Sequence, residues 1–457
     1  MIIVKDNSDY NDLLAKCNGK SMFVEIIQKN LHKHTVSDEC VCVFVKIHNG
    51  ETHVINFLHN DCKKISGSHN LYQLIESISI KSKYIFVCDK KRFIHLCGIK
   101  SVEDLLIYEF DLGVEKTSDE QFESDYEKLN KHRLYDKQNY YLIIPIVKLK
   151  QSFEKKYEFY SKYIDTFTSC ESYRGLNGVI TETLADVEKN GMHINNIDEF
   201  KFYFPDKKEI PHKEFVYTEY NMLTSTGRPS NRFNGINYAA LPKESGCRQV
   251  FNSRFGNNGM LIMMDYSAYH PRIISNLINF PIELNVNIYD YLGRYYFSID
   301  RNCTKEELQK SKQLTFVNLY GGIKEEYIHI PYFMKTFEYI EHRWKFFNDN
   351  GYIETPIFKR RIQTKHVSNA TPNKLFNYIL QAAETEFSIK NINIVNNFLR
   401  DKQTKIILYT YDSILIDAHK NDGLSTIKEI SLILQDNKFP VKCYVGIDYH
   451  NMTLIDL

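Results

Sequence analysis

Two short apolar segments that each end in an aspartate constrain this chain most strongly. The first covers 260–264 and is followed by Asp265. The second covers 406–411 and is followed by Asp412, after which 414–416 is apolar again. Continuous apolar runs of this length are typical of buried strands, and the second pattern predicts a tight hairpin with an acid at its tip. If the two strands are neighbours, their carboxylates converge.

A converged pair of carboxylates predicts a bound cation. Two buried carboxylates do not both stay ionised without positive charge nearby, and Mg²⁺ prefers such oxygen ligands. Two Mg²⁺ ions about 4 Å apart can clamp the attacking and leaving oxygens of a phosphoryl transfer. For either aspartate alone, a turn after a strand is the commoner explanation. The prediction therefore depends on Asp265 and Asp412 lying together.

Between the two strands lies a segment with the features of a capped helix. Thr304 and Glu307 have the spacing of a capping box, which satisfies free backbone donors at a helix start. Lys312, Phe316 and Tyr320 recur at i, i+4 and i+8, so they share one helix face. That face could hold a triphosphate, a sugar and a base in turn. The alternative is that both rings pack into the core while the lysine faces solvent.

Length and composition are those of an ordinary globular protein. The chain has 457 residues, 43% of them hydrophobic and 25% charged, which excludes collagen-like, coiled-coil and disordered chains and favours two or three domains. The net charge of +1 means that a nucleic-acid partner needs local positive charge. There is no membrane-spanning run, no signal peptide and no CxxC pair, so we expect a soluble, cytoplasmic protein.

Strand-like and helical segments alternate before residue 150. The β-branched and aromatic runs at 21–27, 41–47, 53–58 and 84–87 predict strands. Helical spacing is found at 71–80, 102–110, 148–162, 178–190 and 375–395. The first third is therefore expected to be a mixed α/β domain, joined to the rest by a helix.

Seven short motifs follow one another along the remainder of the chain. They are Thr-Ser-Thr-Gly-Arg-Pro-Ser at 224–230, Asn-Gly-Ile-Asn at 234–237, Arg-Gln-Val-Phe at 248–251, Asp-Tyr-Ser-Ala-Tyr-His-Pro-Arg-Ile at 265–273, Lys-Gln-Leu-Thr-Phe-Val-Asn-Leu-Tyr-Gly at 312–321, Asn-Tyr-Ile-Leu-Gln at 377–381 and Tyr-Asp-Ser at 411–413. In this order and spacing they strongly resemble the family A DNA polymerases, the bacterial DNA polymerase I class, in a compact viral or phage-like form. The resemblance covers about 175–457.

The resemblance implies an α+β right-hand polymerase fold. It has an antiparallel palm sheet, helical fingers and a reduced thumb, and an α/β exonuclease-like domain of the RNase H-like type precedes it. In these terms 1–165 is a degenerate 3′–5′ exonuclease-like domain and 166–457 is the polymerase domain. The polymerase domain divides into a palm at 175–280 and 376–457, fingers at 281–375 and a vestigial thumb near 195–220.

The resemblance also implies a function. The chain is expected to be a template-directed DNA polymerase, a nucleotidyltransferase that extends a primer 3′-hydroxyl with deoxynucleoside triphosphates by a two-metal mechanism. It would act in viral or phage DNA replication in the host cytoplasm, with a primed DNA template as partner. By position, the resemblance assigns Asp265, Asp412 and Lys312 to catalysis; Asp265, Asp412 and the Tyr266 carbonyl to two Mg²⁺ ions; Tyr266, His270, Phe316 and Tyr320 to the nucleotide; and Thr224, Arg228, Asn377 and Gln381 to DNA.

Three positions depart from the family pattern. His270 stands where the family has the glutamate that excludes ribonucleotides, and a histidine ring can either block a 2′-hydroxyl or hydrogen-bond to it. Leu308 replaces a phosphate-binding arginine, whose contact Lys305 or Lys310 could take over, and Ser413 replaces a secondary acid. A single-subunit RNA or primer-synthesising polymerase with relaxed sugar selection is therefore an alternative. A non-catalytic nucleic-acid-binding relic is another.

The thumb and the first domain depart more widely. Only about 30 residues separate the helix ending at 191 from Thr224, where the family inserts a long helical thumb. Phosphate contacts supply most duplex affinity, so we expect low processivity unless a processivity or replisome protein supplies a clamp. In the first domain the best alignment keeps only Glu25 of the exonuclease carboxylates and has Asn139 in place of another. Under another register Asp89, Asp104 or Asp136 could be ligands.

The first domain is therefore expected to have an exonuclease fold without nuclease chemistry. The alternative is an unrelated α/β domain that binds a partner.

Overall fold

The computed structural model describes residues 1–31, 33–67, 70–114, 117–134, 139–205, 214–231, 236–243 and 246–457. They form two compact units. The first covers Met1–Lys189, and the second comprises the described residues from Asn190 to Leu457. Within this described part, no helix combines the length and the apolar composition needed to cross a membrane.

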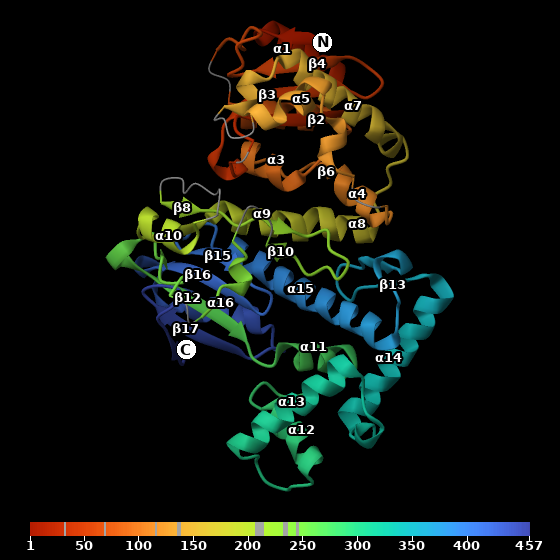
Figure 1. Ribbon diagram of the computed structural model, residues 1–457, viewed down its shortest axis with the longest axis vertical. Coiled ribbons are helices and arrows are strands. Elements are labelled where there is room, and N and C mark those ends of the chain that lie inside the picture. Colours follow the sequence, from red (N-terminus) through yellow and green to blue (C-terminus); the bar gives the residue numbers. More distant parts are fainter. Residues whose placement is uncertain are drawn as a thin grey trace. The chain divides into compact units, whose positions relative to one another are not determined.

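The first unit is built on a six-stranded mixed sheet (Figure 1). In spatial order its strands are β1 (Ile2–Val4), β4 (Thr52–Asn56), β3 (Cys40–Ile47), β2 (Ser21–Gln28), β5 (Tyr84–Val87) and β6 (Glu103–Asp104). The central β2 pairs antiparallel with β3 and parallel with β5. The strands predicted from the apolar runs are confirmed. The very short β1 and β6 were missed.

Helices cover both faces of this sheet because side chains alternate along each strand. Val24 of β2 shares a core with α1 (Asn7–Cys17), α2 (Leu71–Lys81) and α3 (Lys90–Cys97). On the opposite face, Phe23 of β2 stacks on Phe153 of α7 (Ile146–Asp165), with ring centroids 5.3 Å apart. The unit also contains α4 (Leu105–Asp111), α5 (Asp125–Leu134), α6 (Tyr140–Ile143), α8 (Glu171–Gly175), a π-helical turn at Leu176–Ile180 and α9 (Thr181–Asn190).

The first unit does not end at residue 165, where the predicted domain boundary lies. It runs on to Lys189 because ion pairs tie α9 to α3. Lys90 Nζ lies 2.9 Å from Glu182 and 2.8 Å from the Asn177 carbonyl oxygen. Lys91 pairs with the fully buried Glu188. A helix that the sequence assigned to the polymerase part therefore belongs to the first compact unit.

The second unit is built on a five-stranded antiparallel sheet. Its order is β15 (Lys405–Tyr409), β16 (Ser413–His419), β12 (Gly259–Tyr266), β17 (Val441–Gly446) and β18 (Met452–Ile455). Leu261 and Leu415 share a core with α10 (Ile197–Tyr203) and with a small sheet, ordered β11 (Phe251–Asn252), β7 (Met192–Ile194) and β8 (Phe215–Val216). The two predicted apolar strands, β12 and β15, thus lie in one sheet, with β16 between them.

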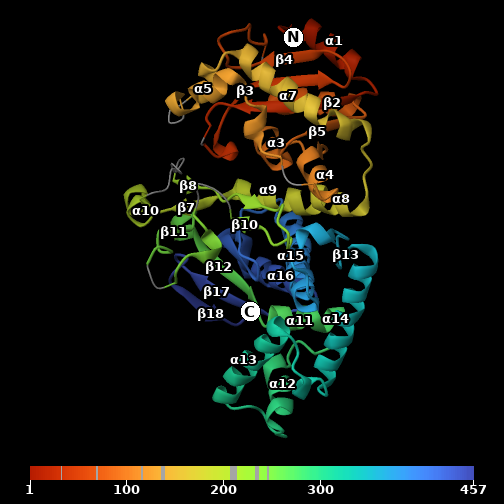
Figure 2. The same cartoon turned by 45° about the vertical axis from the view of Figure 1, so that its right-hand side comes forward.

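Six further helices belong to this unit (Figure 2). They are α11 (Tyr269–Leu277), α12 (Ile288–Phe297), α13 (Lys305–Gly321), α14 (Pro331–Asn350), α15 (Pro372–Phe398) and α16 (Gly423–Gln435). The long α15 contacts α11, α13, α14 and α16. Two hairpins complete the unit, β9 (Tyr220–Asn221) with β10 (Ser230–Asn231) and β13 (Tyr352–Glu354) with β14 (Arg361–Gln363). The region 281–375, predicted as helical fingers, contains α12, α13, α14 and the β13–β14 hairpin.

Two predictions fall partly outside the described residues. In the segment near 195–220 the structure describes α10 and residues 214–220, whereas 206–213 lie outside. In the motif at 234–237 only Ile236 and Asn237 are described. The reduced thumb therefore stays a prediction.

Candidate active site

Asp265 and Asp412 come together because β12 and β16 pair antiparallel. In this register Asp265 lies opposite Ser413, the residue after Asp412. The backbone N–H of Tyr266 donates a hydrogen bond to the carbonyl oxygen of Asp412 at 2.9 Å. Tyr411 adopts a left-handed conformation with φ of 69°, which turns the chain between β15 and β16. The hairpin with an acid at its tip is confirmed.

The positive charge near the two carboxylates is too small to keep their pKa values at the ordinary level. Burial raises the pKa of Asp265 to about 6, and the charge of Asp412 adds to the rise. Burial, followed by the charge of Glu384, also raises the pKa of Asp412. Lys442, opposite Asp265 on β17, and Lys312 act in the other direction on the pKa of Asp265. The raised pKa values indicate that a cation between the two carboxylates would be stabilising.

A cleft of about 850 Å³ joins the two aspartates to α13. Lys312, Phe316 and Tyr320 all line it, and the rings of Phe316 and Tyr320 are stacked with centroids 5.7 Å apart. The buried residues of α13 are Ser311, Thr315, Asn318 and Leu319, on an adjacent face of the helix. Tyr320 is 37% exposed. The alternative that these aromatic rings pack into the core is therefore wrong.

The first turns of α13 show which lysine, Lys305 or Lys310, could take over the contact of the family's phosphate-binding arginine. Thr304 and Glu307 form the predicted capping box. Lys305 and Leu308 line the cleft together with Lys312. Lys310 is not among the lining residues, and its Nζ lies 5.7 Å from the centre of the Phe297 ring. Lys305 is therefore the lysine available to a phosphate in the cleft.

His270 lies in a chain of polar contacts that includes a residue the sequence did not single out. One ring nitrogen, Nδ1, contacts the hydroxyl of Tyr320, and Nε2 lies 3.1 Å from Oε1 of Glu384. Glu384, on α15, is 2% exposed at its side chain. Its other oxygen lies 2.9 Å from Nε of Arg228, whose guanidinium stacks over the Tyr411 ring at 3.9 Å. Asn377, Gln381 and Glu384 share a helix face at i, i+4 and i+7, and this spacing was the available signal.

The other predicted DNA-binding residues lie at the margin of the cleft. Arg228 lines it, whereas Thr224, Asn377 and Gln381 are not among its lining residues. The Thr224 hydroxyl donates to the carbonyl of Arg228 at 2.9 Å, so its observed role is to shape the turn. Asn377 Nδ2 donates to the Tyr320 carbonyl at 3.3 Å.

The turn that carries Arg228 is held by a second arginine, which sequence reasoning missed. Arg360 donates to the carbonyl oxygens of Thr224 and Ser225 at 2.8 and 2.7 Å. Gly227 has a φ of +75°, and a Cβ there would lie 1.9 Å from a guanidinium nitrogen of Arg360. Only glycine therefore fits at position 227.

The residues at the aspartate pair fit Mg²⁺ that shares its ligands with a substrate. Mg²⁺ is usually held by one or two carboxylates together with substrate phosphates, and not by a complete protein cage. Among the described residues, no group of three or more His, Cys, Asp or Glu side chains is arranged to hold a metal ion. Asp265 and Asp412 supply two carboxylates, and their raised pKa values favour a cation. The remaining positions would have to come from backbone oxygens, water and phosphate.

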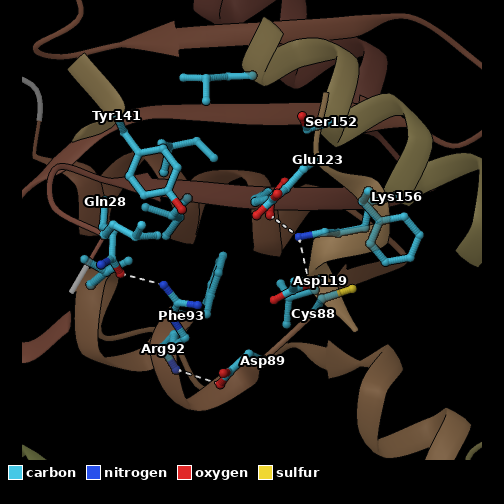
Figure 3. A pocket seen from close by; sticks show the side chains of 18 of the residues that line it. Gln28, Cys88, Asp89, Arg92, Phe93, Asp119, Glu123, Tyr141, Ser152 and Lys156 are labelled. Carbon is cyan, nitrogen blue, oxygen red and sulfur yellow. Dashed lines mark hydrogen bonds and ion pairs between the residues drawn. The ribbon is translucent and has the colours of Figure 1, made fainter. Parts of the chain in front are cut away.

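A second cavity, of about 140 Å³, lies in the first unit (Figure 3). It is lined by Glu25 of β2, the one carboxylate that the best exonuclease alignment keeps, by Asp89, a candidate under another register, and also by Asp119, Glu123 and Glu127. Lys156 of α7 reaches into it: its Nζ lies 2.5 Å from Glu25 and 3.3 Å from Asp119, and its side chain is 12% exposed. The ammonium group therefore occupies the space between two of the carboxylates.

The carboxylates of this cavity already have internal partners. Glu123 pairs with Lys131 at 2.9 Å, and Glu127 accepts a hydrogen bond from the Ser124 hydroxyl at 2.7 Å. Asp89 caps α3 by accepting from the backbone N–H of Arg92 at 3.2 Å. These residues do not fit a divalent cation, because binding one would require displacement of Lys156.

The other predicted exonuclease positions lie apart from the cavity. Asp104 is buried at the start of α4, where it accepts from the backbone N–H of Lys90 at 2.7 Å and of Leu106 at 2.8 Å. Asn139 precedes α6 and is not among the lining residues. Asp136 lies outside the described residues.

Comparisons with known proteins agree with the motif resemblance. No protein-family model matches the chain. The chain is similar to a DNA polymerase of Bacillus phage SP01, with 22% identity over a match that covers 48% of this chain and 29% of the phage protein. The chain thus spans less than a third of that relative's length.

A solved structure gives the fold. The chain is similar to the POL domain of Pol1 from M. smegmatis, in complex with DNA primer-template and dNTP. The TM-score is 0.69 and the sequence identity 12%, over 99% of this chain and 100% of that chain. The resemblance to DNA polymerases is confirmed, and the chain has the α+β fold of a polymerase domain.

Replacing Asp265 by Asn should stabilise the metal-free protein. Because the pKa of Asp265 is raised to about 6 in the folded state, its charge weakens the fold as pH rises from the unfolded value near 4 through about 6. We expect Asp265→Asn to raise the free energy of unfolding by about 1–2 kcal/mol at pH 7.5. Urea denaturation in EDTA measures the gain.

The gain should fall away as pH drops below the unfolded pKa near 4, where Asp265 becomes protonated in both states. Mg²⁺ should stabilise the wild type more than the variant. The exposed Asp401→Asn serves as the matched control and should leave stability unchanged. Equal stability of Asp265→Asn and wild type at pH 7.5 would contradict the account of the pair.

Replacing Lys156 by Met should destabilise the first unit, because it leaves Glu25 and Asp119 without their shared cation. Loss of one partner from a buried pair costs about 3–5 kcal/mol. Since Asp119 is partly exposed, we expect about 2–3 kcal/mol. Thermal unfolding of Lys156→Met and of its neighbour control Lys155→Met measures the difference, and equal midpoints would contradict the assignment.

Proposed function

We propose that this chain is a template-directed DNA polymerase that extends the 3′-hydroxyl of a primer with deoxynucleoside triphosphates. One observation carries the proposal. Two aspartates, one on β12 and one in the turn before its partner strand β16, line one cleft with a helix that presents a lysine followed by two stacked aromatic rings. The phage relative and the polymerase-domain fold support the same reaction.

Each residue of the cleft has a part in this reaction. Asp265, Asp412 and the carbonyl oxygen of Tyr266 hold Mg²⁺, which when bound favours ionisation of the attacking hydroxyl and neutralises charge on the phosphates. Lys312 binds the triphosphate and is placed to give a proton to the leaving pyrophosphate. Lys305, one helical turn before Leu308, adds a second positive charge for the phosphates. Catalysis of this kind depends mainly on positioning and electrostatic stabilisation.

The aromatic and polar residues around the cleft would hold the sugar, the bases and the duplex. Phe316 packs on the incoming sugar and Tyr320 lies near the template base. Arg228, Asn377 and Gln381 contact the minor groove at the primer end, where acceptors shared by all base pairs allow the shape of a pair to be checked without reading its sequence. Thr224 supports this surface through the turn that carries Arg228.

We further propose that the polymerase works in viral or phage DNA replication and grips duplex DNA weakly. The short segment near 195–220 leaves little room for the helical thumb that would hold duplex phosphates. A processivity or replisome protein would then supply the missing grip. The first unit is assigned an exonuclease-like fold whose nuclease chemistry is lost.

Primer extension tests the proposed reaction. With a primed DNA template, dNTPs and Mg²⁺, the wild type should extend the primer. Asp412→Asn should lose at least about 10³-fold in rate, because transition-state charge loses its main support. Lys312→Ala should lose about 10²-fold, with much of the loss in the KM for the nucleotide, because the triphosphate loses a cation.

Two control variants match these changes. Asp401→Asn removes an exposed acid, and Lys310→Ala removes a lysine on the same helix that lies outside the cleft. Both should extend primers at the wild-type rate. Extension that proceeds equally well with Asp412→Asn would refute the assignment. Extension with ribonucleotides as readily as with deoxynucleotides would favour an RNA or primer-synthesising polymerase.

Nuclease chemistry is tested separately. Incubation of the wild type with a 3′-labelled single strand and Mg²⁺ or Mn²⁺ should leave the strand intact, because Lys156 occupies the space between Glu25 and Asp119. Shortening of the strand that is abolished by Glu25→Gln but kept in Asp412→Asn would contradict the loss of nuclease chemistry in the first unit.

A further inference from the structure

The carboxylate of Glu384 lies in the wall of the cleft, where the sequence motifs give no reason to expect one. It comes from the middle of α15 and is 2% exposed at its side chain, yet it lines the cleft with Asp412 and Tyr320. A buried carboxylate is costly unless it is paired. Its partners therefore indicate what it does.

Glu384 joins side chains from three separate elements. Oε1 lies 3.1 Å from Nε2 of His270 on α11, and Oε2 lies 2.9 Å from Nε of Arg228 in the turn before β10. Through His270 the chain continues to the Tyr320 hydroxyl on α13. Movement of the His270 ring would break contacts at both of its nitrogens. The ring is thus held in one orientation at the edge of the cleft.

The consequence for a bound sugar follows from the number of hydrogen bonds that the His270 ring can make. A histidine ring has two polar atoms, Nδ1 and Nε2. The Tyr320 hydroxyl hydrogen-bonds to Nδ1, whereas Nε2 is buried 3.1 Å from Oε1 of Glu384, in an ion-pair contact that lacks hydrogen-bond geometry. A ribose 2′-hydroxyl that reached the ring would find only its carbon edge. A ribose 2′-hydroxyl buried there without a hydrogen-bond partner is disfavoured. A deoxyribose has no hydroxyl at this position, so it does not carry that cost.

We propose that Glu384 is a positioning residue for sugar selection: by holding the His270 ring with Nε2 buried against its carboxylate, it turns the histidine into a gate against ribonucleotides. The inference rests on the proposed polymerase function. It assigns the gate's carboxylate to α15, whereas the family resemblance places a glutamate at position 270 itself. His270 and Glu384 together would then exclude ribonucleotides, as a single glutamate does in the family A DNA polymerases.

Competing dATP against ATP opposite a templating thymine tests the proposal. The measured quantity is the ratio of kcat/KM for the two nucleotides. Glu384→Met, which keeps volume but removes both oxygens, should lower the dATP preference by about 10- to 100-fold, because the His270 ring is no longer held and can turn Nε2 toward the 2′-hydroxyl. Glu384→Gln keeps a polar oxygen beside Nε2 and should retain most of the preference.

A neighbouring buried acid provides the matched control. Glu386, two residues along α15, is also buried, but it accepts from the backbone N–H of Ile357 at 2.8 Å and of Phe358 at 3.2 Å, away from the cleft. Glu386→Gln should change stability without changing the sugar ratio. An equal fall in the ratio for Glu386→Gln and Glu384→Met would overturn the proposal, since it would indicate a general packing effect.

A double-variant cycle tests the coupling directly. His270→Glu alone brings two carboxylates to the 3.1 Å contact that now joins His270 and Glu384, so extension with dATP should fall sharply. Adding Glu384→Met removes the repulsion, and the double variant should recover at least about 10-fold over His270→Glu. Purely additive effects of the two changes would contradict the coupling.

Failure of the gate and failure of the polymerase proposal can be told apart by binding. With primer-template and Ca²⁺ in place of Mg²⁺, dATP and ATP binding is measured without turnover. Preferential dATP binding that Glu384→Met weakens, in a protein that does not extend primers, would support the gate and refute the polymerase. Extension with an unchanged sugar ratio in Glu384→Met would refute the gate alone. No binding of either nucleotide would refute both.

Discussion

Antiparallel pairing of β12 with β16 is the constraint on which the second unit's chemistry depends. The register sets Asp265 opposite Ser413, and the Tyr266 N–H to Asp412 carbonyl bond closes the end of the pair. A slip of one residue would turn Asp265 to the other face of the sheet. The apolar residues that precede each aspartate fix the register, because they must face the cores on either side. The partial desolvation of the two carboxyl groups is thus a by-product of strand packing, and it raises the pKa of both.

Helix α13 completes the cleft by reversing the usual arrangement of an amphipathic helix. Its buried face is made of small or polar residues such as Ser311 and Thr315, with Ser311 donating to the Tyr289 carbonyl at 2.6 Å. Its aromatic rings are consequently left for the cleft. Glu384 then links the histidine beside these rings to Arg228. In both units, acidic side chains line the site. Lys156 pairs with Glu25 and Asp119 in the first unit, whereas no ion pair of this kind joins Asp265 or Asp412 to a described residue of the second.

Much of this could be predicted from local sequence. The strand at 260–264, the hairpin around Asp412, the capping box at Thr304 and the shared face of Lys312, Phe316 and Tyr320 follow from periodicity and spacing. Spacing alone did not show which face of α13 is buried, because that depends on what packs against it. Glu384 and Lys156 were missed for a related reason. Glu384 lies at i+7 from Asn377, and Lys156 lies on the helix predicted at 148–162, but a charged residue at such a position gains its partner only through tertiary packing. The first compact unit extends past the predicted boundary at 165, and the ion pairs between α3 and α9 that hold it are equally non-local.

The central claim is that Asp265 and Asp412 together hold the cations of a phosphoryl transfer. The most direct measurement is a crystal structure of the protein with primer-template, incoming dATP and Mn²⁺, in which anomalous scattering locates the metal. The account predicts anomalous peaks between the two aspartates and the triphosphate, with Lys312 on the phosphates and the sugar beside His270. Bound nucleotide without metal at the aspartates, or metal bound elsewhere in the cleft, would contradict it.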